Sequence, residues 1–348
     1  MIRNLQVLRA FAALSVVYLH VVSDAGLNLG IGFGGYGVDL FFVISGFTMA
    51  FIGRTGAGLF FLRRCIRIVP LYWAATLGTF LIAWFAPDLL QSASASVPHL
   101  LHSLLFLPYP NKLGLMQPTL ALGWTLNYEM YFYLVFAVAL LFTRRFAPLL
   151  ATLLLAVNAA AIRLAGTHDK AVLFYADPII CEFALGVAVY YLLECTRAWR
   201  PVQIRAILRA PLLASAALLA VIALPLQEIF IAADRALYAG IPAMVLLLCA
   251  ISLELFYSIS PKHRWFVVLG DSSYVLYLIH PYIIYGVIRL LLTPAHRGIG
   301  GTALAIVVLP LLATLAAVAI HLVLERPLLE YLRGRIPKGF PARAAAAA

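Results

Sequence analysis

The chain has 348 residues, of which 64% are hydrophobic and only 11% are charged. A soluble domain carries about 25% charged residues, so this composition excludes a water-soluble globule. The net charge of +11 suggests nucleic acid, but the basic residues stand in short loops between apolar segments, where they act as topology signals. We therefore exclude nucleic acid as a partner and predict an all-α polytopic membrane protein, with membrane lipids around it.

Apolar stretches long enough to cross a bilayer recur along the whole chain. We predict about ten transmembrane helices, at residues 5–23, 34–53, 70–87, 124–143, 147–165, 172–193, 211–226, 236–258, 265–292 and 299–324. With both termini in the cytoplasm, 19 of the 25 Lys and Arg residues lie on the inner side, which agrees with the positive-inside rule. We expect 1–330 to form the membrane domain, 331–348 a disordered cytoplasmic tail, and 88–123 an outer lumenal or re-entrant segment.

The first predicted helix contains two ionisable residues, Arg9 and His20. Eleven residues make three helical turns plus roughly 20°, so both side chains share one face and lie about 16 Å apart along the axis. Ionisable residues inside a span are costly and need a reason. A snorkelling Arg and a satisfied core His are the simpler explanations, and the aligned pair alone is weak evidence of a site.

Three further ionisable residues lie in the outer half of predicted spans. Asp39 and Glu129 each stand six residues from the outer end of a span, and His280 lies near the middle of another. Together with His20 they place two carboxylates and two imidazoles at comparable depth. A His–carboxylate cluster suits general-base chemistry, because the imidazole takes a proton near neutral pH and the carboxylate orients it. Structural ion pairs between packed helices are the alternative.

A basic cluster is predicted on the inner side, in the stretch FLRRCIRIVPLYW. It contains Arg63, Arg64 and Arg67, followed by Pro70 and Tyr72. Membrane topology alone explains three arginines at this position. Guanidinium groups also match phosphate geometry in a bidentate manner, so the cluster, with Arg9 at the same level, is a candidate site for a phosphorylated cytoplasmic donor.

Several other classes of site are missing from the sequence. There is no Walker loop, dinucleotide fingerprint or H-E-x-x-H motif, and the four cysteines lack metal-ligand spacing, so we expect free thiols and no metal. The residues alone leave two classes open. One is a membrane enzyme that transfers acyl groups, and the other is a secondary transporter or glycan flippase that uses intramembrane charges as a proton relay.

The sequence resembles the acyltransferase 3 family of membrane acyltransferases over residues 4–327. NLQVLRAFAALSVVYLH carries the family's Arg-x10-His pattern, at Arg9 and His20. Further blocks are GGYGVDLFFVISGF (34–47), FLRRCIRIVPLYW (61–73), GWTLNYEMYFY (123–133), SSYVLYLIHP (272–281) and the closing ERP (325–327). The block GWTLNYEMYFYLVF most resembles the exopolysaccharide acetyltransferase branch.

The resemblance implies a multi-pass protein of the bacterial inner membrane with no permanently bound cofactor. Its donor would be acyl-coenzyme A, most simply acetyl-coenzyme A, and its acceptor a carbohydrate hydroxyl, including that of a lipid-linked sugar. His20 would act as general base or as transient acyl carrier, oriented by Asp39 or Glu129. The donor would be held by Arg9, Arg63, Arg64, Arg67 and Tyr72. Acceptor-side or supporting roles would fall to Ser273, Tyr274 and His280.

Overall fold

The computed structural model describes residues 2–24, 35–53, 57–90, 93–196, 209–226, 236–291 and 299–336. These residues are helical apart from their connections, and the one β-type pairing among them is an isolated bridge between Pro110 and Met116. The predicted helical membrane architecture is therefore confirmed. Most of the predicted tail, residues 337–348, and the predicted inner loop at 197–208 lie outside the described residues.

The chain, which we predicted as one membrane domain, separates into two compact units. Unit 1 comprises Met1–Phe47 and Cys181–Leu324, and unit 2 comprises Thr48–Ile180 and Glu325–Ala348. Helix α2 begins in unit 1 and ends in unit 2. Each unit therefore contains two separate stretches of the chain, and each is described by itself.

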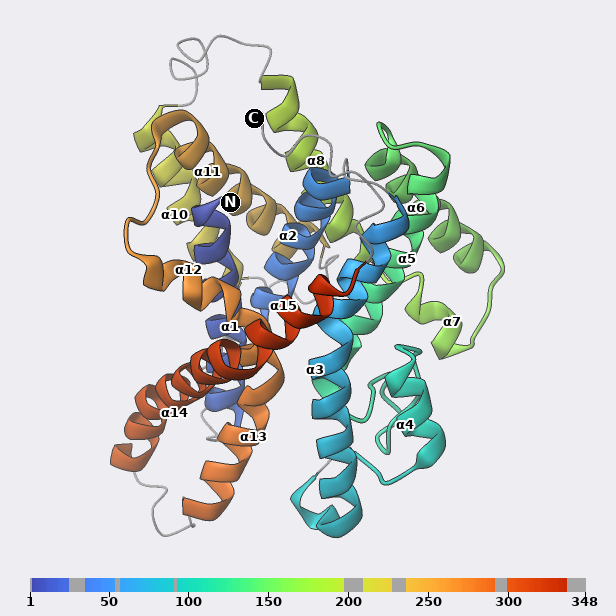
Figure 1. The fold of residues 1–348 in the computed structure, drawn as a ribbon, viewed down its shortest axis with the longest axis vertical. Helices are drawn as coiled ribbons and strands as arrows, with labels where there is room; N and C mark the ends of the chain where they lie inside the picture. Colours follow the sequence, from blue (N-terminus) through green and yellow to red (C-terminus); the bar gives the residue numbers. More distant parts are fainter. Residues whose placement is uncertain are drawn as a thin grey trace. The chain divides into compact units, whose positions relative to one another are not determined.

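The helices of unit 1 are drawn in blue, yellow and orange in Figure 1. They are α1 (Arg3–Asp24), the first part of α2 (Tyr36–Ile52), α8 (Ile180–Thr196), α10 (Ala210–Leu226), α11 (Ile241–Tyr257), α12 (Arg264–Asp271), α13 (Ser273–Leu291) and α14 (Ile299–Ile320). π-Helical turns precede α11 (Ala236–Gly240) and follow α14 (His321–Glu325).

The helices of unit 2 include the longest helix of the chain, and Figure 1 shows α15 crossing it. They are α3 (Ala57–Phe85), α4 (Val97–Leu104), α5 (Trp124–Phe142), α6 (Ala147–Leu164), α7 (Lys170–Phe174) and α15 (Arg326–Gly334). Single 3-10 turns lie at Pro87–Leu89 and Ala121–Gly123.

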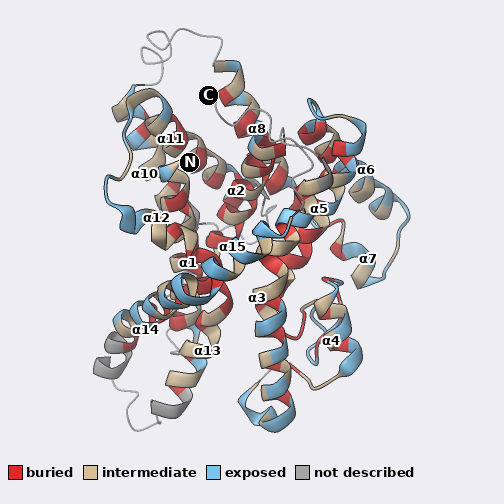
Figure 2. Cartoon of the chain, in the orientation of Figure 1, coloured by how far each residue is buried: buried red, intermediate tan, exposed pale blue. Residues whose placement is uncertain are grey.

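Helix α1 is the centre of unit 1, where it packs against α11, α12, α13 and α14. Its Ala12, Ala13 and Val17 are fully buried, and the helix is largely red and tan in Figure 2. The first amides of a helix have no partner within the helix. In α1, the carboxylate of Glu254 on α11 accepts from the amides of Arg3 and Asn4, at 2.9 and 2.7 Å.

The same contacts fix the directions of the helices around α1. The start of α1 meets the end of α11 at Glu254, so these two helices are antiparallel. Near its start α1 also meets Gly270 of α12, whose added Cβ would lie 2.3 Å from the backbone oxygen of Gln6. Because His20, near the end of α1, meets His280 of α13, the α12–α13 pair runs parallel to α1. These relative directions agree with the predicted topology.

Two glycines allow α2 and α8 to cross at backbone contact. A Cβ on Gly46 would lie 2.1 Å from the carbonyl oxygen of Phe183, and one on Gly186 would lie 2.0 Å from that of Val43. Small residues at such crossings let membrane helices approach closely and gain van der Waals contact. Around the crossing, Phe42 stacks at an angle on Phe183 with ring centroids 4.9 Å apart.

Helix α3 corrects one predicted boundary. We expected a span to start at Pro70, but the helix begins at Ala57 and continues through Pro70. Its 29 residues correspond to about 43 Å, more than a hydrocarbon core of about 30 Å. Proline is tolerated inside membrane helices when neighbouring groups satisfy the freed carbonyl. The arginines that we placed in a loop therefore lie on the helix itself.

A second correction concerns the predicted span 172–193. It is divided between α7 and α8 at Tyr175–Ile179, because Pro178 has no amide hydrogen and Asp177 accepts from the amide of Ile179 at 2.9 Å. The predicted span 265–292 is likewise bent, by 63° between α12 and α13. Among the described residues, six helices are long and apolar enough to cross a membrane, or seven with this bent pair. The count of ten and the orientation stay predictions.

Candidate active site

Two imidazoles meet inside unit 1, where α1 lies against α13. Nε2 of His280 is 3.3 Å from Nδ1 of His20, and the ring centroids are 5.0 Å apart at 56°. His280 is fully buried and His20 is half-buried. The two residues are 260 positions apart in the chain, so this pair exists only in the folded protein.

The backbone partners of the two rings determine where their hydrogens lie. Nδ1 of His20 is 2.9 Å from the carbonyl oxygen of Val16, and Nδ1 of His280 is 3.0 Å from that of Leu276. A carbonyl oxygen only accepts, so each Nδ1 carries a hydrogen. Nε2 of a neutral His280 is then an acceptor. The N–H at Nδ1 of His20 is therefore shared between two acceptors, Nε2 of His280 and the carbonyl oxygen of Val16. Nε2 of His20 keeps its lone pair, and the described residues give it no partner.

This arrangement is that of a general base or a nucleophile. Nε2 of His20 is the ring nitrogen whose lone pair can take a proton or act as a nucleophile, and the other ring nitrogen lies at hydrogen-bond distance from two acceptors. In protein sites the orienting group is often a carboxylate. Here the group at hydrogen-bond distance from Nδ1 of His20 is the imidazole of His280.

Asp39 lies in the first turn of α2, in the same unit, and is fully buried. Close packing holds this end of α2 against α1, since a Cβ on Gly37 would lie 2.3 Å from the carbonyl oxygen of Ala12. In the described part of the chain, Asp39 is not a hydrogen-bond partner of the His20 ring. Its role in orienting His20 stays a prediction.

Ser273 and Tyr274 are both buried at the start of α13, next to its bend with α12. They precede His280 by about two helical turns, or about 10 Å along the axis. A closer aromatic neighbour is Tyr277, whose ring centroid is 6.1 Å from that of His280 and 6.1 Å from that of Phe41 on α2. Sequence reasoning missed Tyr277, although it stands within the block SSYVLYLIHP three residues before His280.

Arg9 lies on the same continuous helix as His20, eleven residues earlier. Its Nη1 donates to Oε1 of Gln6 at 3.2 Å, and Gln6 is the residue that Gly270 of α12 approaches. Because α1 is unbroken between them, Arg9 and His20 are separated by about 16 Å along the axis, as predicted.

Unit 2 contains the predicted arginine cluster and Glu129. Arg64 is buried, and its guanidinium carbon lies 5.6 Å from the ring centroid of Phe60 and 5.4 Å from that of Tyr133 on α5. A cation over an aromatic face is attracted by the ring quadrupole. The hydroxyl of Tyr133 donates to Oε1 of Glu129, one turn earlier on α5. Arg64 and Glu129 are thus joined through one tyrosine, which the sequence analysis did not single out.

Tyr72 has a structural contact of its own. Its ring is fully buried against Phe106, with centroids 4.7 Å apart, and its hydroxyl donates to the carbonyl oxygen of Ser103 at 3.1 Å. The neighbouring Trp73 donates to the carbonyl oxygen of Leu104 at 2.9 Å. These contacts attach the α4 segment to α3, and the predicted role of Tyr72 in donor binding stays a prediction.

The α4 segment has a polar interior. Nε2 of His99 is 2.9 Å from the carbonyl oxygen of Gln117, and the Ser103 and Thr119 hydroxyls are 3.1 Å apart. Burial lowers the pKa of His99, and the nearby His102 lowers it further. Over the part of the chain that the structure describes, no group of three or more His, Cys, Asp or Glu side chains is arranged to hold a metal ion.

Comparison with known proteins identifies a membrane-bound acyltransferase. A family model described as an acyltransferase domain, acyltransferase family 3, matches residues 2–323, and the chain belongs to this family. The match includes both units, and with it the His pair and the arginine cluster.

The chain is similar to the exopolysaccharide production protein ExoZ of Rhizobium meliloti (strain 1021). The chain is 34% identical to it over 333 residues, which are 94% of this chain and 99% of that protein. No solved structure matches the chain.

Proposed function

We propose that the protein transfers an acyl group, most simply acetyl, from cytoplasmic acyl-coenzyme A to a hydroxyl of an exopolysaccharide or of its lipid-linked precursor. The family supports acyl transfer, and the name of the relative ExoZ supports a polysaccharide acceptor. The observation that carries the proposal is the His20–His280 pair, which leaves Nε2 of His20 with a lone pair and no partner among the described residues.

In the proposed reaction His20 supplies Nε2. As a general base it takes the proton of the sugar hydroxyl while the hydroxyl oxygen attacks the thioester carbon, and coenzyme A leaves as the thiol. As an acyl carrier it attacks the thioester first, the carbon–sulfur bond breaks and coenzyme A leaves as the thiol; the sugar hydroxyl then attacks the acyl-imidazole, which releases the neutral imidazole and the ester. Both routes need the same lone pair, so both need His280 to hold the Nδ1 side of the ring.

The donor is proposed to bind through guanidinium groups. Arg63, Arg64 and Arg67 on α3, with Arg9 on α1, match the phosphates of coenzyme A in charge and in bidentate geometry. Glu129 is proposed to support the site through Tyr133. The proposed location is the bacterial inner membrane, which the family supports, and the positive-inside distribution supports cytoplasmic termini.

The test uses membranes that contain the protein, radiolabelled acetyl-coenzyme A and the polysaccharide precursors of the host. Label is expected in saccharide with the wild type and with His263→Ala, a control at an exposed histidine of unit 1. His20→Ala should abolish the label, and His280→Ala should lower it by about tenfold to a thousandfold, since the ring is then no longer oriented. Label retained by His20→Ala would refute the assignment.

A second measurement separates the two routes and the rival class. Without acceptor, label attached to the wild-type protein but not to His20→Ala indicates the acyl-imidazole, and its absence under single-turnover conditions indicates the general base. Movement of saccharide across the membrane without any label in the saccharide would favour a flippase and refute the proposed function.

A further inference from the structure

The C-terminal helix α15 brings a fourth guanidinium group to the arginine cluster of unit 2. Arg333 experiences repulsion from Arg67, Arg64 and Arg63, strongest from Arg67, and attraction from Glu325. α15 packs against α3, and Figure 1 shows the two helices crossing. In the sequence, Arg333 is one of the basic residues that predict an inner location for the tail.

The three arginines of α3 are arranged on one side of that helix. Arg67 follows Arg63 by four residues and Arg64 by three, and residues at these spacings are neighbours on a helix surface. Arg64 is buried under the rings of Phe60 and Tyr133, which fixes its position. Arg67 is half-buried and Arg63 is exposed.

One carboxylate, Glu325, attracts Arg333, against the repulsion of three arginines, so the group keeps an excess of positive charge. In the described part of the chain, no ion pair or hydrogen bond engages the guanidinium groups of Arg63, Arg64, Arg67 or Arg333. Glu330, the acid within α15, pairs with Arg326 at 3.0 Å, where both side chains are more than 60% exposed. Four cations that converge at one place repel one another, and an anion bound among them removes that repulsion.

We propose that Arg333 forms, together with Arg63, Arg64 and Arg67, a phosphate-binding site contributed by two helices, and that its ligand is a phosphate group of the acyl donor. The inference rests on the proposed function, because that function supplies the phosphorylated donor. It adds α15 to the donor site and gives this amphipathic helix a role beyond anchoring.

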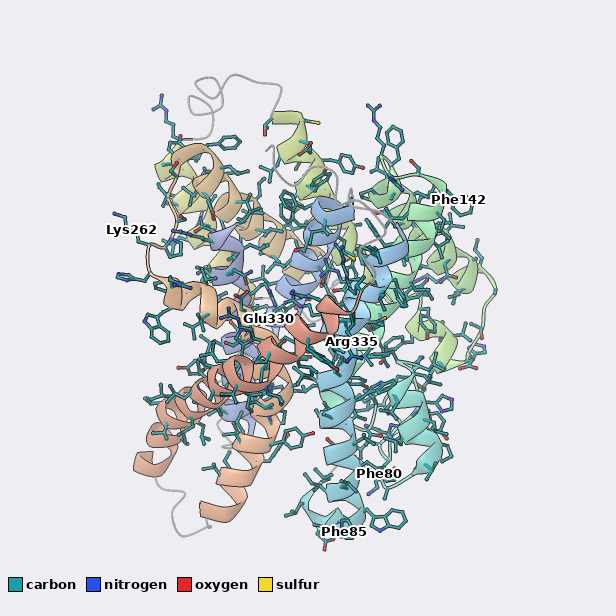
Figure 3. The ribbon with its side chains drawn as sticks, in the orientation of Figure 1. Phe80, Phe85, Phe142, Lys262, Glu330 and Arg335 are labelled. Carbon is teal, nitrogen blue, oxygen red and sulfur yellow. The ribbon has the colours of Figure 1, made fainter. Side chains whose placement is uncertain are left out.

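The structure offers a matched control two residues away. Arg335 is on the same end of α15 and is exposed, and its guanidinium carbon lies 4.7 Å from the ring centroid of Tyr331. It is not among the charges that act on Arg333. Figure 3 labels Arg335 and Glu330 on this helix. Arg335→Ala therefore removes the same charge from the same helix without changing the proposed site.

The experiment uses the full chain in nanodiscs of phosphatidylcholine. Binding of coenzyme A and of 3′-dephospho-coenzyme A is measured by titration, and transfer from the corresponding acetyl thioesters is measured separately. Arg333→Ala should weaken coenzyme A binding and raise KM by about tenfold to a hundredfold, the effect of one lost charge-assisted contact, with little change in kcat. Arg333→Lys should be intermediate, and Arg335→Ala should equal the wild type.

Each result has a defined meaning. The site binds the 3′-phosphate if two results are found. The wild type must bind dephospho-coenzyme A more weakly than coenzyme A, and Arg333→Ala must bind the two ligands equally. Equal weakening by Arg333→Ala for both nucleotides assigns the pyrophosphate. Unchanged binding in Arg333→Ala, or equal weakening in Arg335→Ala, overturns the inference.

A lipid headgroup also carries a phosphate group that matches these four arginines. Nanodiscs that contain phosphatidylglycerol test it. A loss of lipid-dependent stabilisation in Arg333→Ala, with unchanged coenzyme A binding, would overturn the donor assignment. Because binding is read separately, a wild type that binds coenzyme A but transfers no acyl group contradicts the proposed function and leaves the Arg333 result valid.

Discussion

The crossing of α2 and α8 allows a quantitative prediction for Gly186→Ala. The added Cβ would lie 2.0 Å from the carbonyl oxygen of Val43, 2.7 Å from the amide nitrogen of Phe47 and 3.0 Å from Cα of Gly46. Carbon–oxygen contacts in proteins lie at about 3.3 Å or more, so the two backbones must separate by about 1.3 Å. All three obstacles are backbone atoms, and rotation of a side chain relieves none of them.

The expected magnitude combines two opposite effects. Ala in a helix interior is favoured over Gly by about 1 kcal/mol. Overpacking a tight contact costs about 1–3 kcal/mol, and here it also separates the Phe42 and Phe183 rings, now 4.9 Å apart. The free energy of unfolding of Gly186→Ala should therefore be about 1–3 kcal/mol lower than that of a variant in which the added Cβ meets no other atom.

The assay is thermal unfolding in detergent, with Gly286→Ala as the control. Gly286 is inside α13 of the same unit, and an added Cβ there meets nothing within 4 Å. We expect Gly286→Ala to raise the Tm slightly or leave it unchanged, and Gly186→Ala to lower it. A Tm for Gly186→Ala equal to that of the control would show that the helices do not cross at this distance.

Three further predictions concern single polar groups. Glu254→Ala should lower the free energy of unfolding by about 1–2 kcal/mol, because two amides at the start of α1 lose their acceptor. The control Glu330→Ala removes an exposed carboxylate and should change the Tm little, so equal effects of the two substitutions would contradict the cap. Tyr133→Phe should cost about 1–2 kcal/mol, because Glu129 loses a hydrogen bond while the ring beside the arginine remains, and an unchanged Tm would argue against that bond. The third prediction concerns His99, because burial lowers its pKa below the ordinary 6.5. Below pH 6.5 the unfolded chain therefore binds more protons than the folded protein, and the free energy of unfolding should fall as the pH drops. In His99→Gln, the Tm should depend less on pH, and an unchanged pH dependence would contradict the reasoning.

Much of the helical architecture follows from apolar patterning. The predicted spans 124–143 and 147–165 end within one residue of α5 and α6, since each is a predominantly apolar run. The start of α3 was predicted wrongly, because Pro70 and the arginines before it were taken as a loop. A proline stops a helix in water more reliably than in a membrane, where neighbouring groups satisfy the backbone.

The candidate site could be predicted only in part. His20 and His280 were placed at comparable depth from topology, and the structure brings their rings together. Among the described residues, the group that meets Nδ1 of His20 from another helix is the imidazole of His280 and not a carboxylate, and this depends on how α13 packs on α1, which no local pattern records. The same limit applies to Arg333, because its electrostatic interaction with the α3 arginines depends on the packing of α15 against α3 and joins residues more than 260 positions apart.

The long-range contacts of α1 determine when the protein can become active during synthesis. The amides at the start of α1 find their acceptor 250 residues later, at Glu254, and the imidazole of His20 finds its partner 260 residues later. A ribosome has therefore made four-fifths of the chain before the His20 ring meets its partner. The start of α1 lacks its acceptor until α11 is made, and the His20 ring lacks its partner until α13 is made. On the proposed role of His20, premature termination before residue 280 should yield an inactive product.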